Sequence, residues 1–286
     1  MAKIKLEKLI VRQNISENLE SARELIVNNR VLVNGALINN INANFENSVQ
    51  ISLTKLATKY VSRGGYKLEK ALKVFNIDVN GYKALDIGAS TGGFSDCLIQ
   101  NGAEHVIAVD VGRSQLDNKI RNHKQVTIFE RLNAKDLTLE NTSGPCDICV
   151  IDVSFTSILP LLPAIFSVLN DDALIIALIK PQFEGNKNQV NDTGIITDPN
   201  IHIEILKKFV EDFPSQYYLN GLSASPITGA KGNIEFISLF LPATRDSKGS
   251  YTKIDKAGKI NTINIEDVVM QAHNDLRQSE RSEETK

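Results

Sequence analysis

Residues 85–94 read Leu-Asp-Ile-Gly-Ala-Ser-Thr-Gly-Gly-Phe, an apolar run that ends in an acid and then breaks into glycines. A strand that stops on a glycine turn and opens a helix presents free backbone N–H groups to a ligand. The spacing is not the Gly-x-Gly-x-x-Gly of dinucleotide sites, because Asp86 stands two residues before Gly88 and Ser90 takes the place of the second glycine. An acid there repels a pyrophosphate and suits a ligand that carries an amino group and a sulfonium. S-adenosylmethionine is such a ligand.

The second half of a nucleotide site is expected at the end of the next strand, about 20 residues further on. Residues 105–110 supply it as an apolar run that ends in Asp110, 22 residues after Gly88. A carboxylate there can accept both hydroxyls of a ribose. The pattern therefore predicts an adenosine site rather than a plain strand-to-helix turn. The candidate cofactor-binding residues are Asp86, Gly88, Ser90, Gly92, Gly93, Phe94, Asp110 and Asn133.

Composition limits the class of protein. The 286 residues have room for one large domain and a small one. A hydrophobic fraction of 42% and a charged fraction of 23% are ordinary for a soluble globular protein, and no run approaches the length of a membrane span. The lysine-rich residues 1–9 lack the apolar stretch of a secretion signal. We therefore expect a cytoplasmic protein that does not associate with a membrane.

The cysteines do not indicate a metal site or a disulfide framework. Cys146 and Cys149 form a Cys-x-x-Cys, but a zinc site would need a second pair or nearby histidines. Cys149 falls inside an apolar run, whereas a redox cysteine would stand at the start of a helix. We expect all three cysteines, the third being Cys97, to be buried small hydrophobic residues, and no bound metal.

Charge is distributed unevenly, although the net charge is only −2. Residues 1–73 hold 12 Lys and Arg against 6 Asp and Glu, and the remaining residues hold 20 against 28. A basic front end on an acidic body fits a protein that binds a polyanion with one part. A solvated, lysine-rich surface would give the same counts.

The first 60 residues have the pattern of a small helix-and-hairpin module. Asn18 can cap a second helix, and Asn34-Gly35 is a hairpin turn before a closing strand at 49–53. The stretch from Arg23 to Gly35 resembles the alpha-L RNA-binding module. Two places depart from it, Lys5-Leu6-Glu7 and Asn18-Leu19. The RNA-binding candidates are Lys5, Arg23, Arg30 and Arg63.

After a linker and a helix at 66–75, strands and helices alternate. Strands are expected at 82–87, 105–110, 126–130, 147–152, 173–180, 216–222 and 233–241, and a helix at 201–213. This order predicts an open, Rossmann-like, mostly parallel seven-stranded α/β sheet with the ligand at the carboxyl ends of its strands. The expected domains are an RNA-binding domain at 1–59, the sheet domain at 60–243, and a polar tail at 244–286. The tail is expected to hold one short amphipathic helix or to be disordered.

Four charged residues stand where this sheet would converge. Asp152 and Lys180 end two predicted strands, Glu235 interrupts the last one, and Lys67 lies on the helix before the sheet. A charge at the end of an apolar strand is costly unless it is paired, so we expect these two lysines and two acids to pair with one another. Each of them alone would be read as a solvated strand end. Lys-Asp-Lys-Glu is the catalytic tetrad of ribose 2′-O-methyltransferases.

Residues 1 to about 242 resemble the TlyA-type rRNA 2′-O-methyltransferases, historically labelled hemolysin A, which share a catalytic domain with FtsJ/RrmJ-like enzymes. The matching stretches are 60–65, 85–96, 108–112, 150–155, 178–184 and 225–236. Arg113-Ser114 departs from a common Tyr-Gly pair. The resemblance implies S-adenosylmethionine as cofactor, the ribose of an rRNA cytidine as methyl acceptor, and a ribosomal subunit or its precursor as partner. It makes Lys67, Asp152, Lys180 and Glu235 the catalytic residues; we expect a monomer.

Three rival functions remain open at this point. A base methyltransferase that modifies amino groups usually carries Asp/Asn-Pro-Pro-aromatic where Val153-Ser154-Phe155 stands, and one that modifies carbon 5 of cytosine needs a cysteine after that strand, whereas Cys146 precedes it. A membrane-lytic hemolysin would need an apolar span or a strongly basic amphipathic helix. A non-catalytic ribosome-assembly factor would tolerate the loss of Lys180 or Asp86, and both are present.

Overall fold

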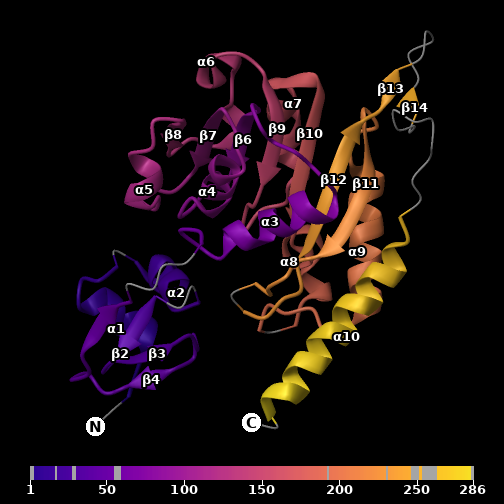
Figure 1. Ribbon diagram of the computed structural model, residues 1–286. Coiled ribbons are helices and arrows are strands. Elements are labelled where there is room, and N and C mark those ends of the chain that lie inside the picture. Colours follow the sequence, from indigo (N-terminus) through magenta and orange to yellow (C-terminus); the bar gives the residue numbers. More distant parts are fainter. Residues whose placement is uncertain are drawn as a thin grey trace. The chain divides into compact units, whose positions relative to one another are not determined.

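The computed structural model describes residues 3–16, 18–27, 30–54, 59–191, 193–229, 231–245, 251–252 and 263–284. The chain divides into two compact units, Met1–Arg63 and Gly64–Lys286 (Figure 1). The division falls a little beyond the boundary expected after residue 59. The residues expected to form the polar tail belong to the second unit.

The first unit packs two helices on a small sheet. Its elements are β1 (Ile4–Lys5), α1 (Leu6–Arg12), α2 (Leu19–Val27), β2 (Val31–Val33), β3 (Ala36–Ile38), β4 (Asn44–Phe45) and β5 (Ile51–Leu53). The side chain of Asn18 accepts the Ser21 N–H at 2.9 Å, so the predicted helix cap is confirmed. Asn34 and Gly35 have φ of 51° and 82°, the left-handed backbone that a two-residue hairpin turn requires. The sheet order is β3-β2-β5, and the apolar stripe of α1 is fully buried against it and α2.

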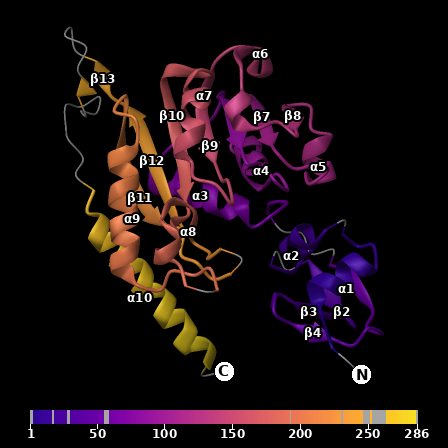
Figure 2. The same ribbon diagram turned by 180° about the vertical axis from the view of Figure 1, so that it is seen from behind.

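The second unit is built on a seven-stranded sheet, which confirms the predicted fold class. Its strands are β6 (Lys83–Ile87), β7 (His105–Asp110), β8 (Val126–Glu130), β9 (Cys146–Ile151), β10 (Leu169–Ile179), β11 (Tyr217–Ala224) and β12 (Phe236–Pro242). They lie in the order β11-β12-β10-β9-β6-β7-β8, with β8 and β11 at opposite edges (Figures 1 and 2). Strands β6 to β10 pair in parallel, and β12 is antiparallel to both of its neighbours.

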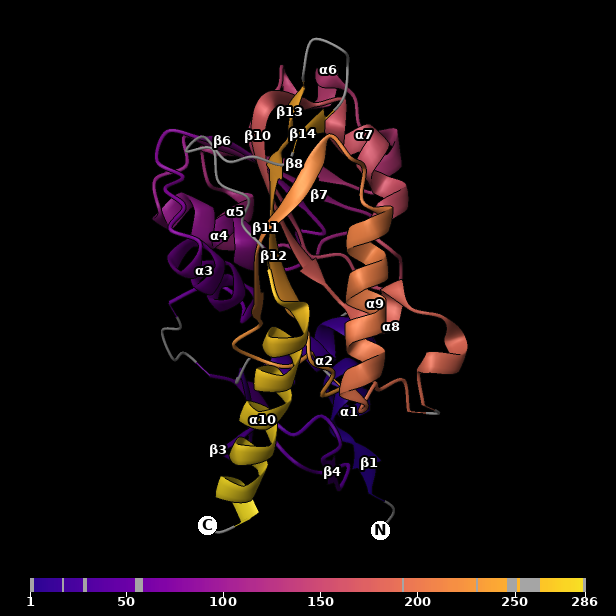
Figure 3. The ribbon, with the colours of Figure 1, turned by 90° about the vertical axis from the view of Figure 1, so that its right-hand side faces the viewer.

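Helices cover both faces of this sheet. They are α3 (Gly64–Val74), α4 (Gly93–Gln100), α5 (Asn118–Arg121), α6 (Leu139–Thr142), α7 (Leu162–Phe166), α8 (Pro181–Glu184), α9 (Pro199–Asp212) and α10 (Ile265–Glu284), and a small hairpin pairs β13 (Thr244–Arg245) with β14 (Tyr251–Thr252). Figure 3 shows α3 and α4 on one face and α7 and α9 on the other. Because the strands are buried on both faces, they read as continuous apolar runs.

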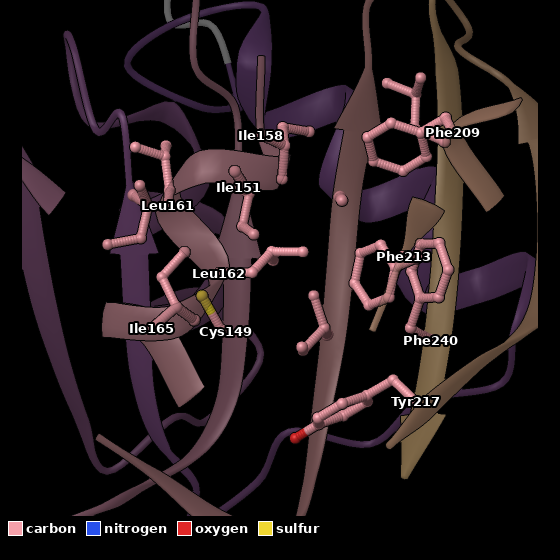
Figure 4. Close-up of a cluster of buried hydrophobic side chains, with 14 of the residues drawn as sticks. Cys149, Ile151, Ile158, Leu161, Leu162, Ile165, Phe209, Phe213, Tyr217 and Phe240 are labelled. Atoms are coloured by element: carbon pink, nitrogen blue, oxygen red, sulfur yellow. The ribbon is translucent and has the colours of Figure 1, made fainter. Parts of the chain in front are cut away.

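The core lies between the sheet and the α7–α9 layer. Figure 4 shows Ile151, Leu162 and Ile165 on one side of the cluster and an aromatic group on the other. In that group the rings of Phe213 and Phe240 stack with centroids 3.8 Å apart. Cys97, Cys146 and Cys149 are free and buried, as expected, and burial raises the pKa of Cys146 to about 11. No helix in the described ranges has the length and apolar character needed to cross a membrane.

Helix α10 is longer than the short helix that the sequence predicted, and it is part of the fold. It packs against α9 and β11 (Figure 3). Ile265, Val269 and Ala272 are buried in the main core, and Val268 and Leu276 pack against it. These apolar residues recur at helical spacing on one face, so burying them against α9 stabilises a helix that would not form alone. Residues 265–284 are therefore not a disordered tail. The residues at 246–250 and 253–262 lie outside the described ranges.

A buried pair of histidines joins α10 to α9. His202 Nδ1 lies 2.8 Å from His273 Nε2, and both side chains are buried. Burial, assisted by the neighbouring His273, lowers the pKa of His202 to about 4, and burial and then Arg277 lower the pKa of His273. The charge of Asp198 acts against this and raises the pKa of both histidines. The folded state therefore prefers both imidazoles neutral.

Acidification should weaken the second unit through this pair. Between pH 6.5 and about 4 the unfolded chain binds a proton at His202 that the folded chain does not, so stability present above pH 6.5 is lost as the pH falls. We expect the free energy of unfolding to drop by about 2 kcal/mol from this residue between roughly pH 7 and pH 5. Urea unfolding at both pH values should show a shallower drop for His202→Gln than for the wild type. Equal drops in the two proteins would contradict this role.

Candidate active site

The candidate site lies at the carboxyl edge of the parallel strands, where the strand order reverses. The chain passes from β6 to β7 on one side of the sheet and later returns to β9 on the other side of β6. The helices that follow β6 and β9, α4 and α7, lie on opposite faces of the sheet (Figure 3), and such a reversal is where open α/β sheets bind ligands. The residues after β6, β7, β9 and β10 meet there, so the sheet topology brings together acids that are far apart in the sequence.

The glycine turn after β6 is shaped by close backbone packing. Gly88 has φ of 81°, and a Cβ at this position would lie 2.6 Å from the carbonyl oxygen of Asp152. Gly92 has φ of 92°, and a Cβ there would lie 2.9 Å from Ile120. No other residue type fits either position without a shift of the neighbouring chain. Gly92 is also the N-cap of α4, so the first N–H groups of that helix, beginning at Gly93, face the turn.

Asp86 carries one carboxylate oxygen without a partner. Its side chain is fully buried, and Oδ2 accepts the Ser95 hydroxyl at 2.6 Å. Oδ1 has no hydrogen-bond partner among the described residues. Burial raises the pKa of Asp86 to about 7, and the charges of Asp152 and Asp110 contribute in the same direction. A buried, unpaired acceptor is costly, so this oxygen marks the place of a donor that a ligand would bring.

Asp110 is held in a fixed orientation at the end of β7. Its Oδ2 accepts the Ser90 N–H at 2.8 Å, and its Oδ1 accepts the Gly112 N–H at 2.6 Å. Ser90 reaches this bond with a left-handed φ of 48°. Each carboxylate oxygen has two lone pairs, so both keep one for a further donor. The arrangement is suited to the two hydroxyls of a ribose.

The two remaining cofactor candidates differ in exposure. Phe94 lies in the first turn of α4 with its side chain buried in the core, so only its backbone can face a ligand. Asn133 is exposed and caps a short 3-10 turn, where its side chain accepts the Lys135 N–H at 3.1 Å.

The four predicted catalytic residues form one connected chain of charges. Lys180 Nζ lies 2.7 Å from Asp152 Oδ1, and Lys67 Nζ lies 4.0 Å from Asp152 Oδ2. Lys67 Nζ also donates to Glu235 Oε2 at 2.6 Å. The side chain of Glu235 is 4% exposed and that of Asp152 19%. Two positive and two negative charges thus lie side by side with little contact with water, and each has its counter-charge.

Strand register explains why residues so distant in sequence meet. Ile179 pairs with Phe236 across the antiparallel β10–β12 ladder, so Lys180 and Glu235 leave the sheet at neighbouring positions. One detail of the prediction is wrong, because Glu235 precedes β12 rather than interrupting it. Asp152 directly follows β9, and Lys180 directly follows β10. Outside the ladder, these side chains can turn toward one another without breaking the apolar faces of the sheet.

Asp152 is held in its charged form. Burial works to raise its pKa, but the charges of Lys180 and then Lys67 outweigh burial, and the pKa lies below its ordinary value. A carboxylate between two lysines can orient both of them.

Two further residues at this edge were not identified from the sequence. Ser154 Oγ accepts a hydrogen bond from Lys180 Nζ at 2.8 Å. Phe155 is 78% exposed, has φ of 65°, and its ring centroid lies 5.3 Å from that of Phe183. A phenylalanine three residues after a predicted strand end was the available signal. The left-handed backbone that turns it outward could not be read from residue types.

The RNA-binding candidates of the first unit differ in how far their side chains are exposed and paired, and so in how easily they could contact RNA. Arg23 donates two hydrogen bonds to the buried carboxylate of Glu7, and the bond to Arg23 lowers the pKa of Glu7. Lys5 is exposed at the end of β1, whereas Arg30 and Arg63 are half-buried. Arg23 therefore has a structural partner within its own unit.

This fold and this site define a class of protein. The S-adenosylmethionine-dependent methyltransferases have this seven-stranded sheet with one antiparallel strand, with Asp86 before a glycine turn after β6 and Asp110 at the end of β7. Residues 60–240 match the family described as FtsJ-like methyltransferase, and the chain belongs to this family.

Named relatives cover most of the chain. The 16S/23S rRNA (cytidine-2′-O)-methyltransferase TlyA of Mycobacterium tuberculosis is 38% identical over 229 residues, which is 79% of this chain and 85% of that protein. The 23S rRNA (cytidine-2′-O)-methyltransferase TlyA of Campylobacter jejuni is 31% identical over 249 residues, or 80% of this chain and 96% of that protein. A solved structure from Streptococcus thermophilus that carries a hemolysin label is 34% identical, covers 98% of this chain and 99% of its own, and has a TM-score of 0.72.

The residues present fit S-adenosylmethionine, the cofactor of this class. The unpaired Asp86 Oδ1 is placed for an ammonium group, and the Asp110 carboxylate for ribose hydroxyls. The N–H groups at the start of α4, beginning at Gly93, would face a carboxylate. When bound, this cofactor supplies a methyl group activated by a sulfonium.

Proposed function

We propose that this protein methylates the 2′-hydroxyl of a cytidine ribose in ribosomal RNA. The connected Lys67, Asp152, Lys180 and Glu235 side chains carry the proposal, because this tetrad fits ribose rather than base methylation. Relatives named for cytidine-2′-O methylation of rRNA support the choice of substrate. Val153-Ser154-Phe155 stands where an amino-group methyltransferase would carry its proline pair, and this argues against the base.

The chemistry follows from the groups at the edge of the sheet. A ribose hydroxyl is a poor nucleophile because its proton is held far above neutral pH, and transfer is an in-line displacement in which positioning supplies much of the rate. Lys180 contacts the ribose oxygen and either accepts its proton or stabilises the charge that develops on it. Asp152 orients Lys180 from one side, and the Lys67–Glu235 pair holds Asp152 from the other.

RNA is held by the basic first unit, with residues 1–59 as the RNA-binding domain. The partner is a ribosomal subunit or its precursor. Lys5, Arg30 and Arg63 are candidate contacts, and Arg23 contributes where its pairing with Glu7 allows. The exposed Phe155 offers an aromatic face beside the tetrad. The protein acts as a cytoplasmic monomer.

Binding of rRNA should weaken as salt rises, because contacts to phosphates release counterions. We expect the affinity for an rRNA fragment to fall at least about tenfold between roughly 50 and 200 mM KCl. Filter binding across that range measures the slope. An affinity that is insensitive to salt would contradict phosphate-dominated binding.

The cellular experiment compares rRNA from cells with and without the gene. Ribose methylation mapped at every rRNA nucleotide should reveal at least one cytidine whose 2′-O-methyl group is lost on deletion and restored by the wild-type gene. Unchanged maps would overturn the proposal. The hemolysin label of some relatives is tested by liposome leakage, where we expect the purified protein to release no dye.

A further inference from the structure

The amine of Lys180 has two fixed partners. Nζ lies 2.7 Å from Asp152 Oδ1 and donates to Ser154 Oγ at 2.8 Å. A lysine nitrogen is tetrahedral, with one bond to carbon and three remaining directions. The Ser154 oxygen takes one of these directions, and the Asp152 carboxylate lies within ion-pair distance of the same amine. Lys180 is buried and Ser154 is exposed, so the second bond joins a buried amine to a hydroxyl at the surface.

The segment that carries Ser154 is anchored on both sides. Before it, the Asp152 N–H donates to the carbonyl of Ile87 at 2.9 Å. After it, the Glu184 carboxylate accepts the Ser157 hydroxyl at 2.5 Å and the Ile158 N–H at 2.9 Å. These anchors hold the segment in the conformation that places Ser154 against the amine.

The contacts of Glu184 also connect the loop after Asp152 to the loop that begins at Lys180. Glu184 ends the helix α8 that Lys180 opens, so the loop that supplies the amine also fixes the segment that supplies its hydroxyl partner. The left-handed backbone of Phe155, next to Ser154, is costly for a residue other than glycine and persists because of these contacts. Ser154 is thus held toward Lys180 by the surrounding structure rather than by its own bond alone.

We propose that Ser154 is a positioning residue that, together with the ion pair to Asp152, aims Lys180 Nζ at the ribose oxygen. The inference rests on the proposed ribose methylation. Without the Ser154 hydroxyl the amine keeps only Asp152 as a partner and can rotate away from the attacking oxygen.

Steady-state kinetics separate positioning from substrate contact. Ser154→Ala should lower kcat about tenfold to a hundredfold, with KM for S-adenosylmethionine and for RNA unchanged. Ser154→Thr keeps a hydroxyl and should restore most of kcat. Thr156→Ala is the matched control, since the Thr156 hydroxyl bonds only to the Ser157 carbonyl among the described contacts, and it should behave as the wild type. A kcat of Ser154→Ala equal to that control, or a loss confined to KM for RNA, would overturn the proposal.

A second measurement does not depend on activity. In protein labelled with 15N-lysine, the Lys180 Nζ protons should exchange with water faster in Ser154→Ala than in the wild type, because they lose the hydrogen bond to Ser154 Oγ. An unchanged exchange rate would show that the hydroxyl does not hold the amine. Faster exchange in Ser154→Ala, found together with a wild-type protein that fails to methylate ribose, would support the contact and overturn the proposed function, so the two failures are distinguishable.

Discussion

Replacing Lys180 with alanine should lower methyl transfer to rRNA by about a thousandfold or more. The substitution removes the group that contacts the ribose oxygen and leaves Asp152 buried beside Lys67 alone. Affinity for S-adenosylmethionine should change by no more than about twofold, because the candidate cofactor residues are on other strands. Transfer of a tritiated methyl group measures the first effect, and calorimetry measures the second.

The control for this substitution is Lys208→Ala. Lys208 is exposed on α9 and pairs with Asp212, so its removal should leave turnover unchanged. Near-native turnover of Lys180→Ala would show that Lys180 is not the residue that acts on the ribose oxygen. Lys180→Arg then separates the two candidate roles, since a guanidinium keeps the charge but cannot accept a proton. Substantial activity in that variant would assign charge stabilisation, and its loss would favour proton transfer.

Binding of S-adenosylmethionine should strengthen as the pH rises through about 7. Asp86 is half-protonated near that pH, and an ammonium group beside Oδ1 would favour its carboxylate. The bound state therefore carries fewer protons on Asp86 than the free protein, and affinity grows with pH. We expect the affinity at about pH 7.5 to exceed that at pH 6 by roughly eightfold to tenfold, measured by calorimetry.

Asp86→Asn should remove this dependence and weaken binding by about tenfold to a hundredfold. Asp212→Asn, at an exposed position on α9, serves as control and should bind and titrate as the wild type. Affinity of the wild-type protein that is flat between pH 6 and pH 7.5 would contradict the role of Asp86, as would an Asp86→Asn variant that keeps the wild-type profile.

The sequence predicted those features that follow from short-range pattern. Apolar runs that end in Asp110, Asp152 and Lys180 located the strand ends, because an unpaired charge is costly inside a strand that is buried on both faces. The convergence of Lys67 with Glu235 could be predicted only from the tetrad pattern of a known family. Their distance depends on how α3 packs against β12, which a single sequence does not specify.

Other features depend on tertiary packing and were missed for that reason. The contact of Ser154 with Lys180 depends on how the loops after β9 and β10 pack together, which residue types alone do not specify. Helix α10 was expected to be short because its second half is polar, yet burial of its apolar face against α9 stabilises the whole helix. Arg23 was chosen for its charge, and only the fold shows that Glu7 lies beside it.

The position of the transferred methyl group distinguishes ribose methylation from base methylation. Ribosomal RNA from a deletion strain is methylated by the purified protein with labelled S-adenosylmethionine, digested to nucleosides and separated by mass spectrometry. The arrangement of Lys67, Asp152, Lys180 and Glu235 predicts that the label appears in 2′-O-methylcytidine. Label on the cytosine base, or no label in any nucleoside, would contradict it.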